Sequence, residues 1–514
     1  MKISQVKIAN FRSYANKVCI DFNNLTAFVG KNDVGKSTVL EALDIFFNEG
    51  KGVIKLDKED INKGCAKDND KDIKIAVVFE KLPESIIIDD SNQTTLADEY
   101  LLKTDGKLEV IKIYPEAGKE KIFIKAAHPT NPACSDLLQK KQADLKKIIK
   151  EPRVCDDLTK NASMRKAIWN HYKNDLQLQE IEIDVSKEDA KNIWTKLKEY
   201  MPLYSLFQSD RKNSDGDSEI QDPMKLAVQE ILKDQEIIGS LNEVAIKVTE
   251  KLKEVADGTC AKLQEMNPEI AKTLHPVIPS SDSLKWLDVF KSVSISGDDD
   301  IPLNKRGSGV KRLVLLNFFR AEAERRKGNR NVPDVIYAIE EPETSQHPDH
   351  QKKLIDALIT LSQSEHTQII LTTHSPSLVK MLKFEHLRLV QNKDGAKQVL
   401  PVEKNELPYP SLNEVNFLAF FEANEEYHNE LYGFIEHSGW LTDYKTGKEE
   451  HDYHNSKSGK NEKCILSVYI RNQIHHPENT CNIRFTPKQL LDSVSQMRDF
   501  INQQRGVGTK LQAA

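Results

Sequence analysis

The stretch from Gly30 to Thr38 constrains the fold of this chain more than any other. It reads Gly-Lys-Asn-Asp-Val-Gly-Lys-Ser-Thr and fits the pattern G-x-x-x-x-G-K-[ST]. The apolar run Asn24–Val29 precedes it like a buried strand, and Lys36–Leu43 follows with the apolar spacing of a helix. A strand, a glycine-containing turn and a helix in this order make a P-loop, so the sequence predicts an α/β nucleotide-binding fold.

The P-loop residues also predict how a nucleotide is held. Glycines at both ends of the loop let the backbone turn tightly, so that several N–H groups and the helix N-terminus face phosphate oxygens. Lys36 is expected to neutralise the β- and γ-phosphates, and Ser37 to offer its hydroxyl to Mg²⁺. The expected cofactors are therefore ATP and Mg²⁺, with contacts from Gly30, Asn32, Gly35, Lys36, Ser37 and Thr38.

Composition limits the size and the partners of the protein. The 514 residues, 39% of them hydrophobic, suffice for one large core and at least one smaller core. The chain has 73 Lys and Arg against 79 Asp and Glu, so its formal charge of −6 provides no global field that attracts nucleic acid. Seven scattered cysteines without a C-x-x-C pair argue against a zinc site. No apolar run approaches about 18 residues, so we expect a soluble cytoplasmic protein without a membrane partner.

Two predicted strands in the second half of the chain end in polar residues. The strand Val335–Ile339 leads into Glu340 and Glu341, and a second apolar strand leads into His374. Hydrolysis of ATP requires one carboxylate near Mg²⁺ and a second that orients or deprotonates water, while an imidazole can contact the γ-phosphate. We therefore expect Glu340 to be a metal ligand, and Glu341 and His374 to be catalytic.

These motifs, together with two short strands around Asn10-Phe11-Arg12-Ser13-Tyr14, resemble the heads of RecF, SMC and related ABC-type ATPases. The resemblance implies that Arg12 lies near the phosphates, although an ordinary surface arginine fits the sequence equally well. It also implies that Ser308 and Gly309, in a Gly-Ser-Gly turn before an apolar helix, form the signature motif that binds the γ-phosphate. A P-loop and a signature on one chain cannot meet, so ATP is expected between head-to-tail copies in a dimer or a higher even-numbered oligomer.

The chain departs from that family pattern at two points. Glu340 stands where Asp is usual, and its extra methylene predicts slow hydrolysis. No convincing Q-loop glutamine is found before the expected insertion. Asp60 lies in the corresponding interval, and the residue that faces magnesium there stays unassigned.

The predicted architecture is an ABC-type P-loop ATPase head with a helical insertion and a small all-α domain at the C-terminus. Inside the insertion, Gly239-Ser240 and Asp257-Gly258 are expected to break the helical pattern, which favours a compact lobe over a long arm. Its lysine-rich helix is either a solvated face or a nucleic-acid track. The four segments are 1–134 and 301–405 for the two halves of the head, 135–300 for the insertion and 406–514 for the last domain.

The C-terminal segment contains a second candidate site. We expect a mobile polar loop over Thr442–Lys463 and a helix over Asn461–His476 that carries Arg471 and Asn472. Asn472 and His476 share a helical face, so an amide, an imidazole and a guanidinium can converge on one phosphodiester. The stretch resembles the R-[polar]-x-x-x-H motif of HEPN domains, many of which are metal-independent ribonucleases. A catalytic site and a docking or dimerisation module both fit.

Taken whole, the chain resembles the ATPase subunits of bacterial antiphage defence systems, in particular Septu and retron-associated PtuA-type ATPases. The resemblance implies an ATPase that controls a separate HNH-type nuclease, with DNA or tRNA as the substrate of the complex. Two alternatives stand beside it. One is a self-contained HEPN ribonuclease toxin gated by the ATPase head. The other is a RecF-like DNA-repair ATPase, which the acidic composition disfavours.

Overall fold

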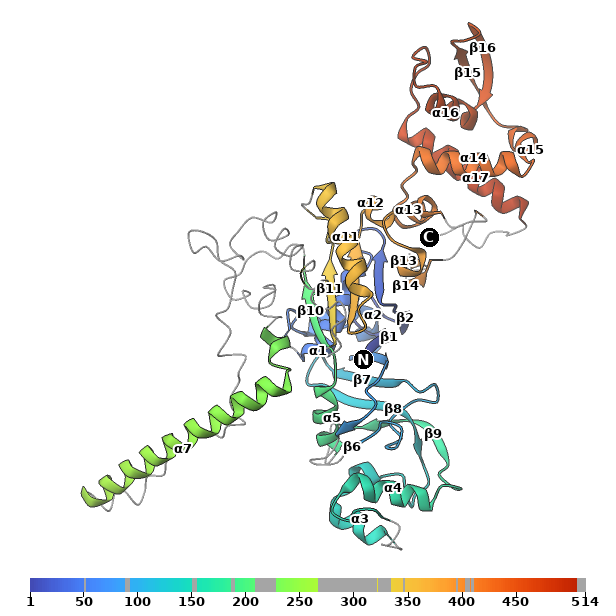
Figure 1. Ribbon diagram of the computed structural model, residues 1–514. Coiled ribbons are helices and arrows are strands. Elements are labelled where there is room, and N and C mark those ends of the chain that lie inside the picture. The colour runs from blue at the N-terminus through green and yellow to red at the C-terminus, as the bar shows by residue number, and fades with distance from the viewer. Residues whose placement is uncertain are drawn as a thin grey trace.

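The head, which is the part of the chain that carries the P-loop, is built around two six-stranded sheets (Figure 1). The computed structural model describes residues 1–49, 52–87, 93–149, 155–185, 190–208, 228–266, 321, 334–344, 347–393, 396–402, 407 and 411–505. Ser308 and Gly309, expected in the signature motif, lie outside these residues. The expected α/β class and P-loop head are confirmed by the two sheets.

The first sheet carries the P-loop and is parallel except at one edge. Its strand order is β10-β11-β12-β3-β13-β14, and only β14 runs antiparallel to its neighbour. Continuous apolar runs in β3, β11 and β12 suit strands that are buried on both faces. The strands are β3 (Leu25–Val29), β10 (Leu203–Phe207), β11 (Val335–Glu340), β12 (Thr367–Thr373), β13 (Leu387–Lys393) and β14 (Ala396–Pro401).

Two layers of side chains cover this sheet. On one face, Phe28, Ile336 and Ile370 pack in a core shared with helix α1 (Lys36–Asn48) and the second sheet. On the other face, alternate residues such as Ala27 and Tyr337 pack against α11 (Pro348–Ser362), α12 (Pro376–Val379) and α13 (Leu412–Phe420). Successive strand residues point to opposite faces, so one run of sequence supplies both layers.

The second sheet is antiparallel, with the order β2-β1-β4-β7-β8-β9. Val6, Ile75 and Val110 on its inner face are fully buried in the core that it shares with α1. The strands are β1 (Lys2–Ala9), β2 (Val18–Asp21), β4 (Asp72–Glu80), β7 (Leu108–Pro115), β8 (Lys121–Pro129) and β9 (Leu178–Asp184). This sheet therefore packs against α1, the helix that follows the P-loop, while α11 lies on the other face of the parallel sheet.

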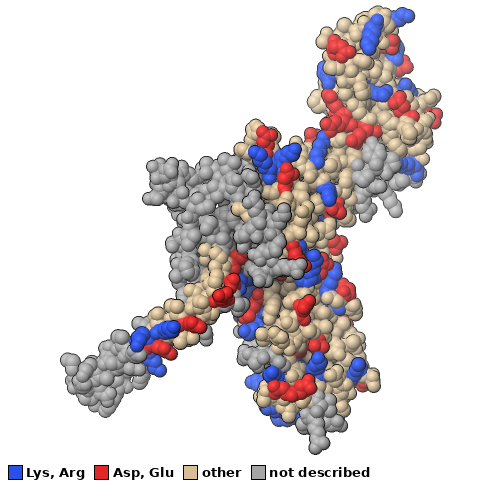
Figure 2. Space-filling model, in the orientation of Figure 1, with Lys and Arg blue, Asp and Glu red and all other residues tan. Residues whose placement is uncertain are grey.

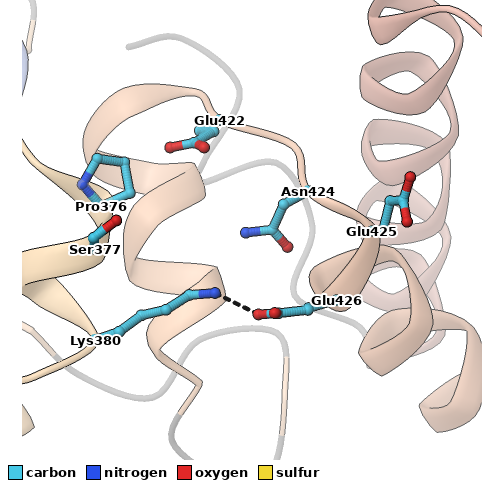
Figure 3. A pocket seen from close by; sticks show the side chains of 7 residues that line it. All are labelled: Pro376, Ser377, Lys380, Glu422, Asn424, Glu425 and Glu426. Atoms are coloured by element: carbon cyan, nitrogen blue, oxygen red, sulfur yellow. Dashed lines mark hydrogen bonds and ion pairs between the residues drawn. The ribbon is translucent and has the colours of Figure 1, made fainter. Parts of the chain in front are cut away.

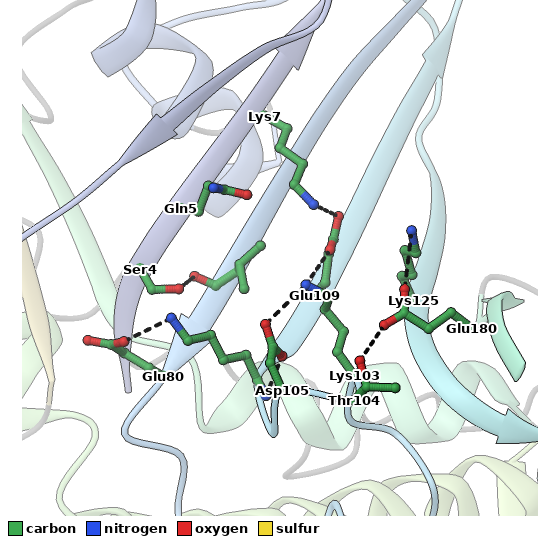
Figure 4. A network of polar contacts seen from close by, with 12 residues as sticks. Ser4, Gln5, Lys7, Glu80, Lys103, Thr104, Asp105, Glu109, Lys125 and Glu180 are labelled. Atoms are coloured by element: carbon green, nitrogen blue, oxygen red, sulfur yellow. Dashed lines mark hydrogen bonds and ion pairs between the residues drawn. The ribbon is translucent and has the colours of Figure 1, made fainter. Parts of the chain in front are cut away.

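Charge pairs link the polar face of the antiparallel sheet (Figure 4). Glu109 on β7 is 2% exposed, and its carboxylate lies 2.6 Å from Lys7 Nζ and 3.6 Å from Lys103 Nζ. Glu180 on β9 accepts a hydrogen bond from Thr104 and pairs with Lys125 at 3.6 Å. Because acids and bases neutralise each other here, this face presents no basic track. Across the face shown in Figure 2, described basic and acidic side chains are likewise interleaved.

Side chains from both sheets fix the helix that follows the P-loop. Tyr204 donates its hydroxyl to the carbonyl of Leu40 at 2.6 Å. Lys112, 1% exposed, donates to the carbonyl of Phe46 at 2.8 Å, near the end of α1. Buried carbonyls at a helix C-terminus need such donors, and a cation there also complements the helix dipole. The orientation of α1, and with it the P-loop, is thus set by strands β10 and β7.

The segment 135–300, expected to be a helical insertion, contains helices and also strands of the head. Strand β9 extends the antiparallel sheet, and β10 forms the edge of the parallel sheet. Its described helices include α3 (Gln142–Ile148), α4 (Asn161–His171), α5 (Ala190–Glu199) and α7 (Gln235–Met266). The four-segment division of the chain stays a prediction.

One expectation about this segment was wrong. Helix α7 runs without interruption through Gly239-Ser240 and Asp257-Gly258, which were expected to break it. A glycine inside a helix costs only about 1 kcal/mol relative to alanine, so the surrounding residues can carry the helix through. In Figure 1, α7 projects away from the two sheets as an arm, which differs from the compact lobe that the sequence favoured.

The C-terminal domain is helical but contains a β-hairpin. The polar stretch expected to be a mobile loop forms β15 (Glu450–Asn455) and β16 (Lys460–Ile465), which pair antiparallel. As a result, the helix expected from Asn461 begins at Leu466. The helices are α13, α14 (Glu425–His437), α15 (Leu441–Lys445), α16 (Leu466–His475) and α17 (Pro487–Gln504). Thr486 caps α17, and its side chain accepts a bond from the N–H of Gln489.

Short elements complete the described fold. They are 3-10 turns at Lys58–Asp60, Leu137–Gln139 and Phe384–His386, the helix α2 (Lys63–Lys67) and the two-residue strands β5 (Ile86–Ile87) and β6 (Gln93–Thr94). Among the described residues, no helix is both long enough and apolar enough to cross a membrane.

Candidate nucleotide site

The P-loop connects β3 to α1 and requires glycine at both of its ends. Gly35 has a φ of 103°, and a Cβ added there would lie 3.0 Å from the hydroxyl oxygen of Ser13. A Cβ on Gly30 would lie 2.6 Å from the carbonyl oxygen of Val390 on β13. No side chain caps α1, whose N-cap is Gly35. The N-terminal N–H groups of this helix are therefore not covered by a capping side chain, an arrangement that suits an anion.

Lys36 is folded back over the loop. Its Nζ donates to the carbonyls of Gly30 at 2.8 Å and Lys31 at 2.7 Å, and the residue is 5% exposed. Burial lowers the pKa of Lys36, while the negative charges of Glu341 and Glu343 oppose this shift. The hydrogen bonds of this buried ammonium described here go to neutral carbonyls, which compensate its charge less well than a directly bonded anion would. An incoming phosphate would supply the missing negative charge.

The carboxyl ends of β11 and β12 bring Glu341 and His374 together beside the P-loop. Since β3, β12 and β11 are parallel neighbours, the residues after these strands meet at one edge of the sheet. Glu341 has a φ of 41° and donates its N–H to the carbonyl of Thr372 at 3.1 Å. The Nδ1 atom of His374 lies 3.0 Å from Oε1 of Glu341. Both side chains remain partly exposed, at 41% for His374 and 25% for Glu341.

Glu343 is a buried carboxylate that the sequence analysis overlooked. Its Oε1 accepts bonds from the hydroxyl of Thr373 at 2.6 Å and from the N–H of His374 at 3.1 Å. Its side chain is only 5% exposed, and its Oε2 is buried without a hydrogen-bond partner among the described residues. Glu343 thus fixes the backbone that carries the histidine. Its place two residues after Glu341 in Glu-Glu-Pro-Glu was the available signal.

Gln208 is a second residue that the sequence analysis missed. It directly follows β10, which lies beside β11, and its Nε2 donates to Glu41 Oε1 at 3.3 Å. Its Oε1 is buried without a hydrogen-bond partner in the part of the chain that the structure describes. Glu41 lies one helical turn after Ser37, so this free amide oxygen lies close to the start of α1. A glutamine directly after a short apolar strand was the signal.

Arg12 lies in the turn between β1 and β2 and is held by two carboxylates. Its Nε donates to Asp60 Oδ1 at 2.7 Å, and its NH1 pairs with Glu41. Asp60, considered for a magnesium-facing role, is therefore occupied by Arg12. Because Glu41 is shared with Gln208, a polar series from Arg12 to Gln208 runs along the first turns of α1.

The C-terminal candidates lie on or next to α16. Arg471 pairs with Glu436 at 3.2 Å, and its guanidinium lies 4.4 Å from the ring centroid of Tyr432. Asn472 is partly buried, and its carbonyl accepts the N–H of His476 at 2.9 Å. The imidazole of His476 lies 3.1 Å from Glu478 and is 44% exposed. Each of the two basic side chains thus already has an acidic partner.

A polar pocket of about 290 Å³ lies between the helix after His374 and the start of the C-terminal domain (Figure 3). Ser377 and Lys380 of the head line one side, and Glu422, Asn424 and Glu425 line the other. The ammonium of Lys380 pairs with Glu426 across it. Among the described residues, no group of three or more His, Cys, Asp and Glu side chains is arranged to hold a metal ion.

A parallel sheet with a P-loop after one strand, and acidic residues and a histidine after its neighbours, defines a P-loop nucleoside triphosphatase. Residues 1–379 match the family described as AAA ATPase domain. The chain therefore belongs to this family.

Curated relatives include nucleases. The Old nuclease of Escherichia phage P2 is 26% identical over 188 residues, 35% of this chain and 31% of that protein. The OLD nuclease of Thermus scotoductus is 32% identical over 21% of this chain and 20% of that protein. Endonuclease GajA of Bacillus cereus is 22% identical over 76% of this chain and 58% of that protein. This chain thus spans less than two thirds of the length of each relative.

Similar solved structures include an Smc head domain with an extended coiled coil, bound to the C-terminal domain of ScpA and derived from Pyrococcus furiosus. It covers 78% of this chain and 96% of its own, with 12% identity and a TM-score of 0.39.

Proposed function

We propose that this chain binds ATP at the P-loop and hydrolyses it slowly. The contact between His374 and Glu341 carries this proposal, because it joins an imidazole and a carboxylate at the edge of the sheet next to Lys36. Glu341 would accept the proton of the attacking water, and His374 would contact the γ-phosphate. Slow turnover is proposed because Glu340 occupies the usual place of Asp.

The site offers a donor set that suits Mg²⁺. Magnesium prefers oxygen ligands and is usually held by one or two protein groups together with substrate phosphates. Ser37 and Glu340 are the proposed ligands, and the buried Oε1 of Gln208, which has no hydrogen-bond partner among the described residues, is an additional oxygen that can face the ion or its water shell. The ion would neutralise charge on the phosphates. Lys36 and the N–H groups of the loop would orient them, while Glu343 would hold the backbone of His374.

We further propose that the chain is the ATPase subunit of an antiviral defence system and controls nuclease activity through its nucleotide state. The similarity to proteins named OLD nuclease and endonuclease GajA supports a link to nucleic-acid cleavage. A separate nuclease, of HNH type by the resemblance to Septu systems, is the proposed partner. A RecF-like repair role is less well supported, since the described face and the overall charge show no extended basic surface.

The decisive experiment is co-purification of the chain with the product of the neighbouring gene. The complex and the chain alone are assayed on DNA and tRNA, with ATP and with a non-hydrolysable analogue. Cleavage by the complex alone, with a rate that depends on nucleotide, is the expected result. The proposal of a separate nuclease is abandoned if the chain alone cleaves as fast as the complex.

A head-to-tail dimer or a higher even-numbered oligomer is proposed as the active assembly. The P-loop and the Ser308-Gly309 motif would complete an ATP site only between two copies. Light scattering with saturating ATP tests this proposal. A stable monomer under these conditions would contradict it.

A ribonuclease site in the C-terminal domain is the second candidate function. It is favoured by the exposure of Arg471 and His476 on neighbouring turns, at 36% and 44% of their side chains. The acidic partners Glu436 and Glu478 weigh against it, because each ion pair must break before Arg471 or His476 can bind a phosphodiester. A docking or dimerisation role for the same residues needs no such rearrangement.

A further inference from the structure

The first residue after α13 contacts the P-loop directly. The Nζ atom of Lys31 lies 4.0 Å from the ring centroid of Phe421. Lys31 follows Gly30 in the loop, and Phe421 ends the helix that leads into the C-terminal domain. A lysine ammonium above an aromatic face is held by the charge distribution of the ring. The contact therefore joins the two parts of the molecule at the nucleotide site.

Phe421 has an unusual backbone for its side chain. Its φ is 56°, in the left-handed region, and its N–H caps α13 by bonding to the carbonyl of Phe417 at 2.8 Å. Glycine or asparagine is the common residue at such a position, because a Cβ makes this conformation costly. Phe421 as a whole residue is nevertheless 50% exposed. A half-exposed aromatic ring on a strained backbone contributes little to a core. The contact with Lys31 is therefore the main interaction that we assign to this ring.

Aromatic side chains continue from Phe421 into the C-terminal domain. The ring of Phe417 lies 6.0 Å from that of Phe421 and 5.7 Å from that of Tyr427 on α14. Arg498 on α17 lies 4.7 Å from the ring of Phe417, and its NH1 donates to the Tyr427 hydroxyl at 2.7 Å. Tyr427 is fully buried, and Phe417 belongs to the same core. A displacement of Phe421 would therefore change the packing of Phe417 and Tyr427.

The same end of the domain also holds the segment after His374. Asn416 on α13 donates its amide to the carbonyl of Pro376 at 3.2 Å, and Lys380 pairs with Glu426 across the polar pocket of Figure 3. The P-loop and the histidine segment are therefore both tied to residues 416–426. These are the two parts of the head that a γ-phosphate would contact.

We propose that Phe421 and Lys31 form a latch that is closed without nucleotide and is opened by ATP, so that occupancy of the P-loop is communicated to the C-terminal domain. The inference rests on the proposed binding of ATP. A charge-assisted hydrogen bond to phosphate is stronger than a cation–π contact at a half-exposed ring, so ATP attracts the ammonium of Lys31 away from Phe421. The ring then loses its partner, and the contacts around Phe417 and Tyr427 can rearrange.

Linkage fixes the sign of the effect on ATP affinity. If ATP weakens the latch, loss of the latch must strengthen ATP binding by the same factor. Replacing Phe421 by Ala should therefore tighten ATP binding about two- to fivefold, the range that corresponds to an exposed cation–π contact. An aromatic residue that contacts the nucleotide itself would give the opposite result, since its loss would weaken binding.

The test measures ATP affinity with Mg²⁺ by titration of a fluorescent ATP analogue into the full chain. Phe421→Ala and Phe421→Gly are both expected to bind more tightly than wild type, and Gly also relaxes the left-handed backbone. Phe421→Tyr keeps the ring and should behave as wild type. Phe485→Ala is the matched control, since Phe485 stacks with Arg484 at 4.4 Å in the same domain but away from the P-loop. It should leave the affinity unchanged.

Hydrogen exchange provides the second measurement. In wild type, a non-hydrolysable ATP analogue with Mg²⁺ should raise exchange in peptides that span residues 412–427. In Phe421→Ala, exchange there should already be raised and should respond little to nucleotide. Unchanged or weaker ATP binding by Phe421→Ala, or no response of these peptides in wild type that demonstrably binds ATP, would overturn the latch. Failure of wild type to bind ATP would instead refute the proposed function, and the latch with it.

Discussion

The Nδ1 atom of His374 lies 3.0 Å from Oε1 of Glu341, although 33 positions separate the two residues along the sequence. The contact exists because β11 and β12 are parallel neighbours and end at the same edge. Glu343 helps to hold His374 in place, because its carboxylate accepts hydrogen bonds from the backbone N–H of His374 and from the hydroxyl of Thr373. A carboxylate oriented by an imidazole, on a histidine whose backbone is held by a buried acid, is suited to positioning a water molecule.

The first prediction concerns Glu341. Glu341→Gln should leave the Kd for ATP within about twofold of wild type and lower turnover by about 100-fold or more, because the amide cannot accept the proton of water. Single-turnover hydrolysis, with binding measured on the same preparation, provides the check. Glu365→Gln, a change of the same kind outside the site, should preserve turnover. Rapid turnover in Glu341→Gln would mean that another residue is the base.

The second prediction concerns Lys36. Lys36→Ala should weaken ATP binding by about tenfold to 150-fold, the loss expected for one or two charge-assisted hydrogen bonds to phosphate. Equilibrium titration measures the effect. Lys74→Ala, which removes an exposed ammonium from β4, should bind ATP as wild type does. Equal affinities for both variants would show that the nucleotide lies elsewhere.

The third prediction concerns Glu343 as a positioning residue. Glu343→Ala should lower turnover by about tenfold while the Kd for ATP stays nearly constant, since only the backbone and ring of His374 lose their support. Glu343→Gln keeps an acceptor oxygen for Thr373 and should recover most of the activity. Steady-state kinetics separates kcat from KM. A purely structural role would affect thermal stability in both variants and leave kcat of the folded enzyme unchanged.

The head was largely predictable from sequence because its signals are local. Glycines at fixed spacing and the unbroken apolar runs of β3, β11 and β12 each specify one element and its polar end. Parallel order then brings those ends together. Gln208 was missed because its relation to the P-loop depends on β10, which joins the sheet beside β11 and places Gln208 near a loop that ends 173 positions earlier, at Gly35.

Elements with weak burial patterns were the least predictable. In the hairpin of β15 and β16, only Tyr453 and Ile465 are buried, so the sequence shows no alternation of apolar and polar residues. Helix α7 was predicted to break at its glycines. The free-energy cost of a glycine inside a helix is too small to end the helix by itself. The contact of Phe421 with Lys31 had no sequence signal, because it depends on how α13 packs against the head.

The fourth prediction is a loss of stability of the C-terminal domain in acid. His428 is fully buried between α14 and α17, bonded to Ser493 at 3.0 Å, and burial lowers its pKa to about 4. The unfolded chain binds this proton near pH 6.5, whereas the folded chain does not. Stability is therefore complete above about pH 6.5 and falls by up to about 1.4 kcal/mol per pH unit as pH approaches about 4.

Unfolding of α14 in urea, followed by pulsed hydrogen exchange after equilibration at about pH 7 and about pH 5, measures this loss. His428→Gln retains a hydrogen-bonding group but cannot titrate, so the pH dependence of its stability should be shallower than that of wild type. Parallel curves for the two proteins would assign the acid sensitivity to other groups.

The last prediction distinguishes the two roles of the C-terminal site. Helical spacing places Arg471, Asn472 and His476 near one another. In the described part of the chain, the imidazole of His476 pairs with the exposed Glu478. Because an exposed imidazole contributes little to folding, His476→Ala should leave ATP binding and thermal stability nearly unchanged. A ribonuclease would lose RNA cleavage by about 100-fold or more with this change. A docking module would instead show weaker subunit or partner association in sedimentation, and wild type would leave RNA intact.

Glu478→Gln, which removes the acidic partner of the imidazole, should preserve or raise cleavage if the site is a ribonuclease. Intact RNA with the wild-type chain in every nucleotide state, also when the partner is present, would eliminate the ribonuclease and leave the head as the regulator of a separate nuclease.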